Sequence, residues 1–153
     1  MLRLRTLIAV CTGSIALTAG LAAADDGADV GAAAEAWITA VNAGDVANLI
    51  PLYHADETSF GGFGGLLSEG VHTEDEMSAL FESGFKTDLK WRHVAVKVFG
   101  KAAVVTGYLA GSATLPGGTV VQNSWRTSMM WVHDGEAWQI VHFHASTLFL
   151  SDG

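Results

Sequence analysis

Alternating apolar and polar residues fill the second half of the chain, a pattern that predicts β-strands. From Leu89 onward, apolar runs are separated by turn signals at residues 99–101, 116–118 and 133–135. The strands that we expect span residues 89–99, 102–114, 119–133 and 136–149. Strands of this length exceed the usual range, so their sheet must twist and curl strongly. The sequence therefore predicts a curled antiparallel meander of four strands.

The first half has helical spacing instead. Apolar residues recur every three or four positions over 29–43, with Trp37 on the apolar side and Gly44 in the stop position. Asp45 is placed to cap a second, short helix that Pro51 ends. We expect both helices to pack on the sheet.

A third helix is indicated further along the chain. Thr73 and Glu76 form a capping-box pattern, which predicts a helix over residues 73–85. Residues 57–60 precede it as a short strand, followed by the glycine-rich stretch 61–65. That stretch lacks the Gly-Lys-Ser/Thr of a phosphate-binding loop.

The last expected strand carries the most distinctive chemistry. Because side chains two residues apart on a strand share a face, five residues should line one surface of the sheet. These are Trp138, Ile140, His142, His144 and Ser146. Two imidazoles on an otherwise apolar wall indicate a pocket.

The N-terminus reads as a secretory signal peptide over residues 1–24. Arg3 and Arg5 give it a basic start, an apolar middle follows, and three alanines at 22–24 form a cleavage site. We therefore expect a protein that is secreted or periplasmic, with one domain over residues 25–153 and no membrane association after cleavage.

Composition narrows the function classes. The only cysteine lies within the expected signal, so the mature domain would use neither disulfides nor thiolate chemistry. The formal net charge of −8 opposes binding to nucleic acid or anionic membranes. No Asp or Glu occurs between Asp88 and Asp134, so the long strands supply no carboxylate to a pocket.

Several short motifs together resemble a known superfamily. They are Asn42-Ala43-Gly44-Asp45, Leu66-Leu67-Ser68-Glu69-Gly70, Asp134-Gly135, Trp138-Gln139, Val141-His142-Phe143-His144 and Ser146. With three helices before a long curled sheet, the chain resembles the nuclear transport factor 2-like (NTF2-like) superfamily. Within it, the chain is similar to SnoaL-like domains and to the association domain of calcium/calmodulin-dependent kinase II.

The resemblance implies a fold more firmly than an activity. It implies an α+β cone in which three N-terminal helices pack on a strongly curved antiparallel sheet around a deep apolar pocket, and commonly a homodimer or larger homo-oligomer. Members range from ketosteroid isomerase, limonene epoxide hydrolase and scytalone dehydratase to non-catalytic oligomerisation modules. The activity must therefore be argued from the site.

Candidate site residues follow from the last strand and the helices. We expect His142 or His144 to transfer protons if the protein is an enzyme, because imidazole titrates near neutral pH. Asp56, Glu57 and Glu69 could enter the pocket from loops, but none matches a catalytic acid of the superfamily. The expected ligand contacts are Trp37, Tyr53, Trp138 and Ser146.

Other interpretations of the two histidines stay open. They could be buried, hydrogen-bonded residues of the scaffold, or metal ligands if His54 or His93 supplied a third ligand. We expect no metal and no cofactor. The leading hypothesis is that a small hydrophobic molecule is bound, or is converted by an isomerase or lyase reaction. The alternative is a non-catalytic oligomerisation or interaction module.

Overall fold

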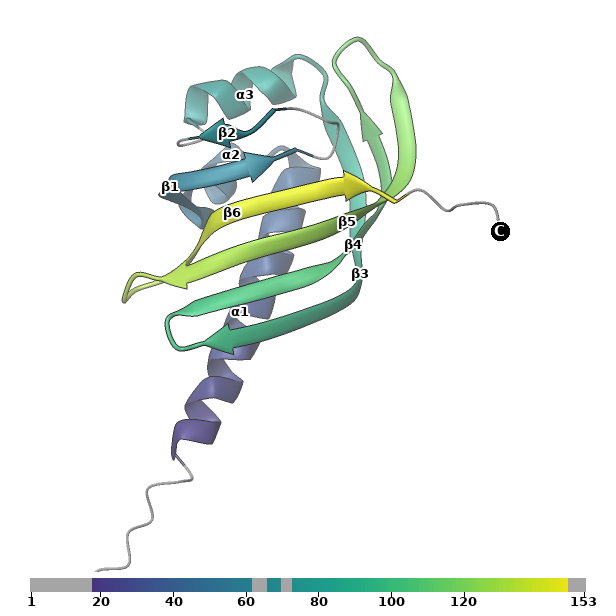
Figure 1. Ribbon diagram of the computed structural model, residues 1–153. Helices are drawn as coiled ribbons and strands as arrows, with labels where there is room; N and C mark the ends of the chain where they lie inside the picture. Colours follow the sequence, from purple (N-terminus) through teal and green to yellow (C-terminus); the bar gives the residue numbers. More distant parts are fainter. Residues whose placement is uncertain (1–17, 62–65, 70–72, 149–153) are drawn as a thin grey trace, which may run out of the picture.

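The computed structural model describes residues 18–61, 66–69 and 73–148. Its elements are α1 (Thr18–Ala43), α2 (Val46–Leu49), the 3-10 helix η1 (Ile50–Leu52), β1 (Tyr53–Phe60), β2 (Ser68–Glu69), α3 (Glu74–Glu82), β3 (Lys86–Phe99), β4 (Ala102–Thr114), β5 (Val120–His133) and β6 (Trp138–Thr147). The six strands form one sheet in the order β2-β1-β6-β5-β4-β3 (Figure 1). The α+β class is confirmed.

The predicted meander is present, but the sheet is mixed. Strands β3, β4, β5 and β6 pair antiparallel in sequence order. Strand β1 is longer than expected, beginning at Tyr53 rather than at residue 57, and it pairs in parallel with β6. The meander itself is antiparallel as expected, and the parallel β1–β6 pair makes the whole sheet mixed, because the long connection between these two strands runs through β2, α3 and the rest of the meander.

The helix caps predicted at Asp45 and Thr73 are both present. Asp45 accepts a hydrogen bond from the Asn48 backbone N–H at 3.2 Å, and the Thr73–Glu76 capping box forms at 3.1 and 3.2 Å. Helix α1 begins at Thr18, earlier than expected, and so runs through the cleavage site expected after residue 24. The signal peptide and the domain boundary at residue 25 stay predictions.

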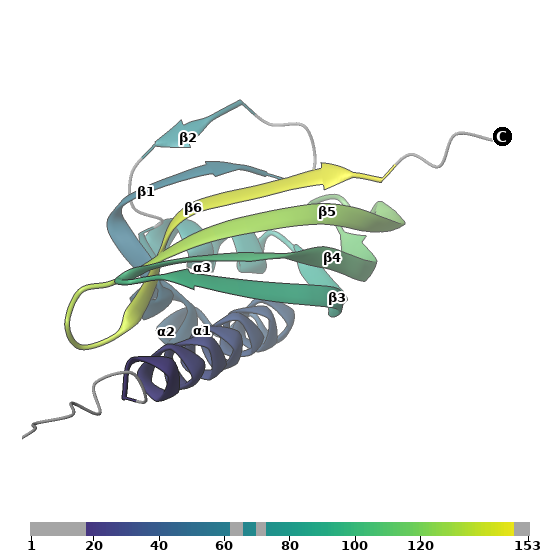
Figure 2. The ribbon, with the colours of Figure 1, turned by 60° about the horizontal axis from the view of Figure 1, so that its bottom comes forward.

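The helices lie on one side of the sheet, and none of the described helices covers the opposite side (Figure 2). The core lies between these layers and includes Val30, Trp37, Leu49, Met129 and Trp131. Burying such large apolar side chains is the main source of stability in a chain of this size.

Asn42 attaches α1 to the sheet. Its amide N–H₂ donates to the Leu89 carbonyl at 2.8 Å, and its amide oxygen accepts from the Leu89 N–H at 3.0 Å. The Thr87 hydroxyl also donates to that oxygen at 2.8 Å. These bonds fix the C-terminal end of the helix over β3, beside the cavity described below.

The sheet curls near a close approach of β3 and β4 at Gly111. Gly111 on β4 has φ +146°, and a Cβ there would lie 2.0 Å from the Asp88 carbonyl oxygen. Only glycine permits this approach of the two backbones. On β3, the pairing shifts register between Arg92 and Ala95. Both irregularities bend the strands, which curve around the helical side.

Strand β6 contains an irregularity that decides which side chains reach the core. Ile140 pairs with Trp131 and His142 pairs with Met130, so Val141 is an extra residue in the β5–β6 ladder. A bulge of this kind reverses the alternation of side chains beyond it. The prediction that residues 138, 140, 142, 144 and 146 share one face is therefore wrong.

Candidate functional site

A cavity of about 230 Å³ lies between the helices and the curved sheet. Its lining is mostly apolar and aromatic, and comes from α1, α3 and the strands β1, β3, β4, β5 and β6. The lining residues are Trp37, Val41, Tyr53, Ser59, Gly61, Met77, Leu80, Phe81, Phe85, Thr87, Leu89, Leu109, Trp125 and Phe143. An apolar pocket with a few polar groups is typical of a small-molecule site.

Trp37 and Tyr53 meet on one wall of the cavity. The indole Nε1–H of Trp37 donates to the Tyr53 hydroxyl oxygen at 2.9 Å. Trp37 also packs against Phe143 of β6, with ring centroids 5.3 Å apart. Because the Tyr53 oxygen accepts from Trp37, its own O–H remains the hydrogen-bond donor of the phenol.

Glu57 is an acidic residue that is fully buried. Its side chain is 0% exposed, and on β1 it lies between Tyr53 and Ser59, which both line the cavity. Burial raises the pKa of Glu57 to about 7, although a hydrogen bond from Ser59 acts in the opposite direction. A carboxyl with such a pKa can both take up and release a proton near neutral pH.

Tyr53 stays protonated next to this carboxyl. Burial raises the pKa of the phenol well above its usual range, the hydrogen bond from Trp37 lowers it, and the charge of Glu57 raises it again. The effect of the Glu57 charge on the phenol is consistent with a carboxylate buried close to this wall of the cavity. At neutral pH the phenol is therefore a hydrogen-bond donor and Glu57 the group that titrates.

Two of the residues predicted to contact a ligand line this cavity. They are Trp37 and Tyr53. Trp138 is buried on the same side of the sheet, but it packs edge-on against His133 at 5.2 Å and does not line the cavity. Ser146 pairs with the exposed Arg126 and does not line it either.

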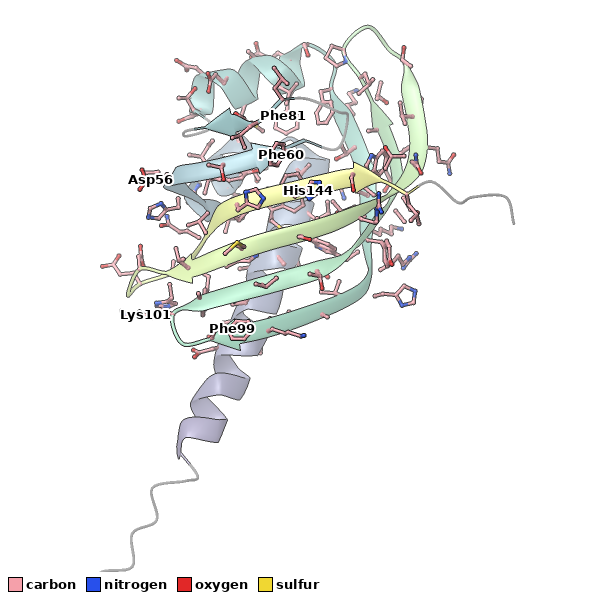
Figure 3. All side chains as sticks on the ribbon, in the orientation of Figure 1. Asp56, Phe60, Phe81, Phe99, Lys101 and His144 are labelled. Atoms are coloured by element: carbon pink, nitrogen blue, oxygen red, sulfur yellow. The ribbon has the colours of Figure 1, made fainter. Side chains whose placement is uncertain are left out.

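The two histidines of β6 lie on the other face of the sheet. His142 Nδ1 shares a hydrogen bond with the Thr58 hydroxyl at 2.9 Å. His144 is exposed, and its ring lies 5.9 Å from that of Phe60. Figure 3 shows His144 and Phe60 near one another on the side of the sheet away from α1. The expectation that both imidazoles face the pocket is therefore wrong, because the bulge at Val141 turns them outward.

Glu57 emerges as a site residue only from the structure. The sequence named it as one of three acids that could enter the pocket from loops. A usable signal was the alternation of Glu57 and Ser59 at the start of the expected strand, which places both on one face. That face turns inward because β1 pairs in parallel with β6. The two strands are far apart in the sequence, so no local pattern predicts their pairing.

Over residues 18–61, 66–69 and 73–148, no group of three or more His, Cys, Asp or Glu side chains is placed to hold a metal ion. His54, suggested as a third ligand, lies 3.9 Å from the Asp56 carboxylate. None of the described helices is both long and apolar enough to cross a membrane.

Comparison with known proteins agrees with this fold. The family model described as a SnoaL-like domain matches residues 30–150. No curated protein sequence matches the chain. Among solved structures, a ketosteroid isomerase-like protein from Erwinia carotovora is 22% identical, with 82% of this chain and 98% of that chain covered and a TM-score of 0.65.

Two further structures share the fold. A proposed dehydratase of the NTF2-like family from Streptomyces avermitilis is 20% identical, with coverage of 83% and 99% and a TM-score of 0.70. A proposed calcium/calmodulin-dependent protein kinase II association domain from Xanthomonas campestris is 18% identical, with coverage of 78% and 85% and a TM-score of 0.63. At these identities the likeness shows the fold alone.

Proposed function

The chain belongs to the SnoaL-like domain family, and from that premise we propose that it binds a small hydrophobic molecule in the cavity and acts on it by proton transfer. The reaction would be of the isomerase or lyase type and would need no cofactor. Glu57 is the observation that carries this proposal, because it is a buried carboxyl with a pKa of about 7 that is hydrogen-bonded to Ser59, and Ser59 lines the apolar cavity.

The roles of the residues follow from their chemistry. Glu57 as carboxylate removes a proton from a carbon beside a carbonyl group, and its carboxylic acid then returns the proton at another position. The Tyr53 hydroxyl, which accepts from Trp37, donates to the oxygen on which negative charge develops. Trp37 and Tyr53 keep the ligand-binding roles expected from the sequence. The proton-transfer role expected for His142 or His144 is assigned to Glu57 instead.

Solvent exchange tests the proton transfer directly. The protein is incubated with 2-cyclohexen-1-one in D₂O, and deuterium in the ketone is followed by mass spectrometry. Wild-type protein should incorporate deuterium faster than Glu57→Gln. Asp56→Asn changes an exposed acid on the same strand, 92% accessible at its side chain, and should behave as wild type. Equal exchange in wild type and Glu57→Gln would contradict the proposed role.

A second candidate function, oligomerisation, is supported by the uncovered face of the sheet. Three large apolar side chains are exposed there: Phe60 at 41%, Met130 at 47% and Tyr108 at 36%. We propose that a second copy of the chain packs on this face, with His142 and His144 inside the interface. Light scattering should then give the mass of a dimer, and Met130→Lys should give a monomer. A monomeric wild type would refute the proposed dimer.

Export is likewise a proposal. It is supported by the basic start and apolar middle of residues 1–24. The mass of the protein recovered from outside the cytoplasm should correspond to a chain that begins at Asp25. A chain that keeps Met1 there would contradict cleavage.

A further inference from the structure

The lining of the cavity disfavours anionic ligands. Among the described residues that line the cavity, none is a lysine, an arginine or a histidine. An anionic ligand would lose its hydration on entry and would find no positive charge to replace it. The carboxylate of Glu57, buried beside Tyr53 and Ser59, would repel it further. A carboxylic acid or a phosphate ester is therefore a poor fit.

The aromatic side chains of the lining favour a cationic ligand. In the part of the chain that the structure describes, six of them line the cavity: Trp37, Tyr53, Phe81, Phe85, Trp125 and Phe143. The faces of such rings attract cations, because their quadrupoles place negative potential above the ring. The attraction grows where water is excluded, as it is in an apolar cavity. Trp37 belongs to a tilted group, with Phe143 at 5.3 Å and Trp91 at 6.3 Å.

The charges outside the cavity agree with this preference. Helix α3 contributes Met77, Leu80 and Phe81 to the lining, and it carries four acidic residues and no basic one. The whole chain has a formal net charge of −8. A negative field of this kind raises the local concentration of cations and their association rate. The nearest cation in sequence, Lys86, is exposed and lies outside the lining.

We propose that the ligand of this cavity is a small organic cation, a hydrophobic amine or quaternary ammonium compound. Its positive charge is balanced by Glu57 and by the ring faces, and its hydrocarbon part fills the apolar remainder of the cavity. The proposal rests on the proposed function, because it assigns a ligand class to the same site. It also fits proton transfer, since a positive charge near the reacting carbon makes a neighbouring C–H more acidic.

Three ligands that share one ring and differ in charge test the proposal. They are phenyltrimethylammonium, the neutral tert-butylbenzene and the anionic benzenesulfonate. Each is titrated against the purified protein loaded with the neutral fluorescent probe N-phenyl-1-naphthylamine, and displacement gives the affinity. We expect phenyltrimethylammonium to bind about tenfold tighter than tert-butylbenzene, as a desolvated cation–π contact permits, and benzenesulfonate to bind weakest.

Variants assign the preference to Glu57. In Glu57→Gln the advantage of the cation over tert-butylbenzene should fall severalfold, while Asp56→Asn should keep it. The ranking in wild type decides the proposal even if Glu57→Gln does not fold. If tert-butylbenzene binds as tightly as the cation, the ligand class is wrong although the cavity binds. If the probe binds and no member of the series displaces it, the ligand class is also wrong. If neither the probe nor any member binds, the proposed function fails with it.

Discussion

Replacing Glu57 by Gln should change how the stability of the protein depends on pH. The carboxyl is buried, and burial raises its pKa from the ordinary value of 4.5 to about 7 in the folded protein. Between these two pH values the folded chain holds a proton that the unfolded chain has released. Stability from this group is therefore fully present below about pH 4.5 and is lost as pH rises through about 7.

The magnitude follows from the same two pKa values. One pKa unit corresponds to about 1.4 kcal/mol, so the rise from 4.5 to about 7 amounts to about 3 kcal/mol. Gln has nearly the same shape as Glu and does not ionise. The free energy of unfolding of wild type relative to Glu57→Gln should thus fall by about 3 kcal/mol between pH 4.5 and pH 8.

Urea unfolding at a series of pH values measures this difference. Subtracting the variant from the wild type removes the contributions of the other ionisable groups that both share. Asp56→Asn is the matched control, since its side chain is 92% exposed on the same strand. A difference between wild type and Glu57→Gln that stays constant from pH 4.5 to pH 8 would refute a carboxyl with a raised pKa.

Four other substitutions test separate parts of the structure by urea unfolding at pH 7. Asn42→Ala removes the bonds that attach α1 to β3 and should cost about 2–3 kcal/mol; a cost below about 0.5 would show that they are dispensable. Thr73→Ala removes a helix cap and should cost about 1 kcal/mol, whereas no change would argue against the capping box. Tyr53→Phe leaves the Trp37 N–H without its acceptor and should cost about 1–3 kcal/mol; an unchanged midpoint would mean that this bond adds nothing. Gly111→Ala should prevent native folding, and a stable native variant would contradict the close approach of β3 and β4.

Local signals predicted most of the fold. The β3–β4 and β5–β6 turns and the caps at Asp45 and Thr73 each depend on a few neighbouring residues, and the structure contains all of them. The full extent of β1 escaped prediction. Its first residue, Tyr53, pairs with Ile140 at the other end of the chain, and such a pairing leaves no local pattern.

The candidate site was predictable only in part. Trp37 was placed on the inner face of its helix by 3.6-residue periodicity, which a helix keeps without interruption. The faces of β6 were not predicted correctly, because one extra residue at Val141 exchanges the two faces beyond that point. This single irregularity removes His142 and His144 from the cavity and places Phe143 in its wall.

The most direct test of the account is whether the cavity, rather than the histidine face, binds small molecules. Binding of N-phenyl-1-naphthylamine is measured by fluorescence in wild type, in Leu80→Trp, which fills the cavity from α3, and in His144→Phe on the opposite face. We predict binding to wild type and His144→Phe, and at least a tenfold loss in Leu80→Trp. Binding that survives in Leu80→Trp and is lost in His144→Phe would contradict the account.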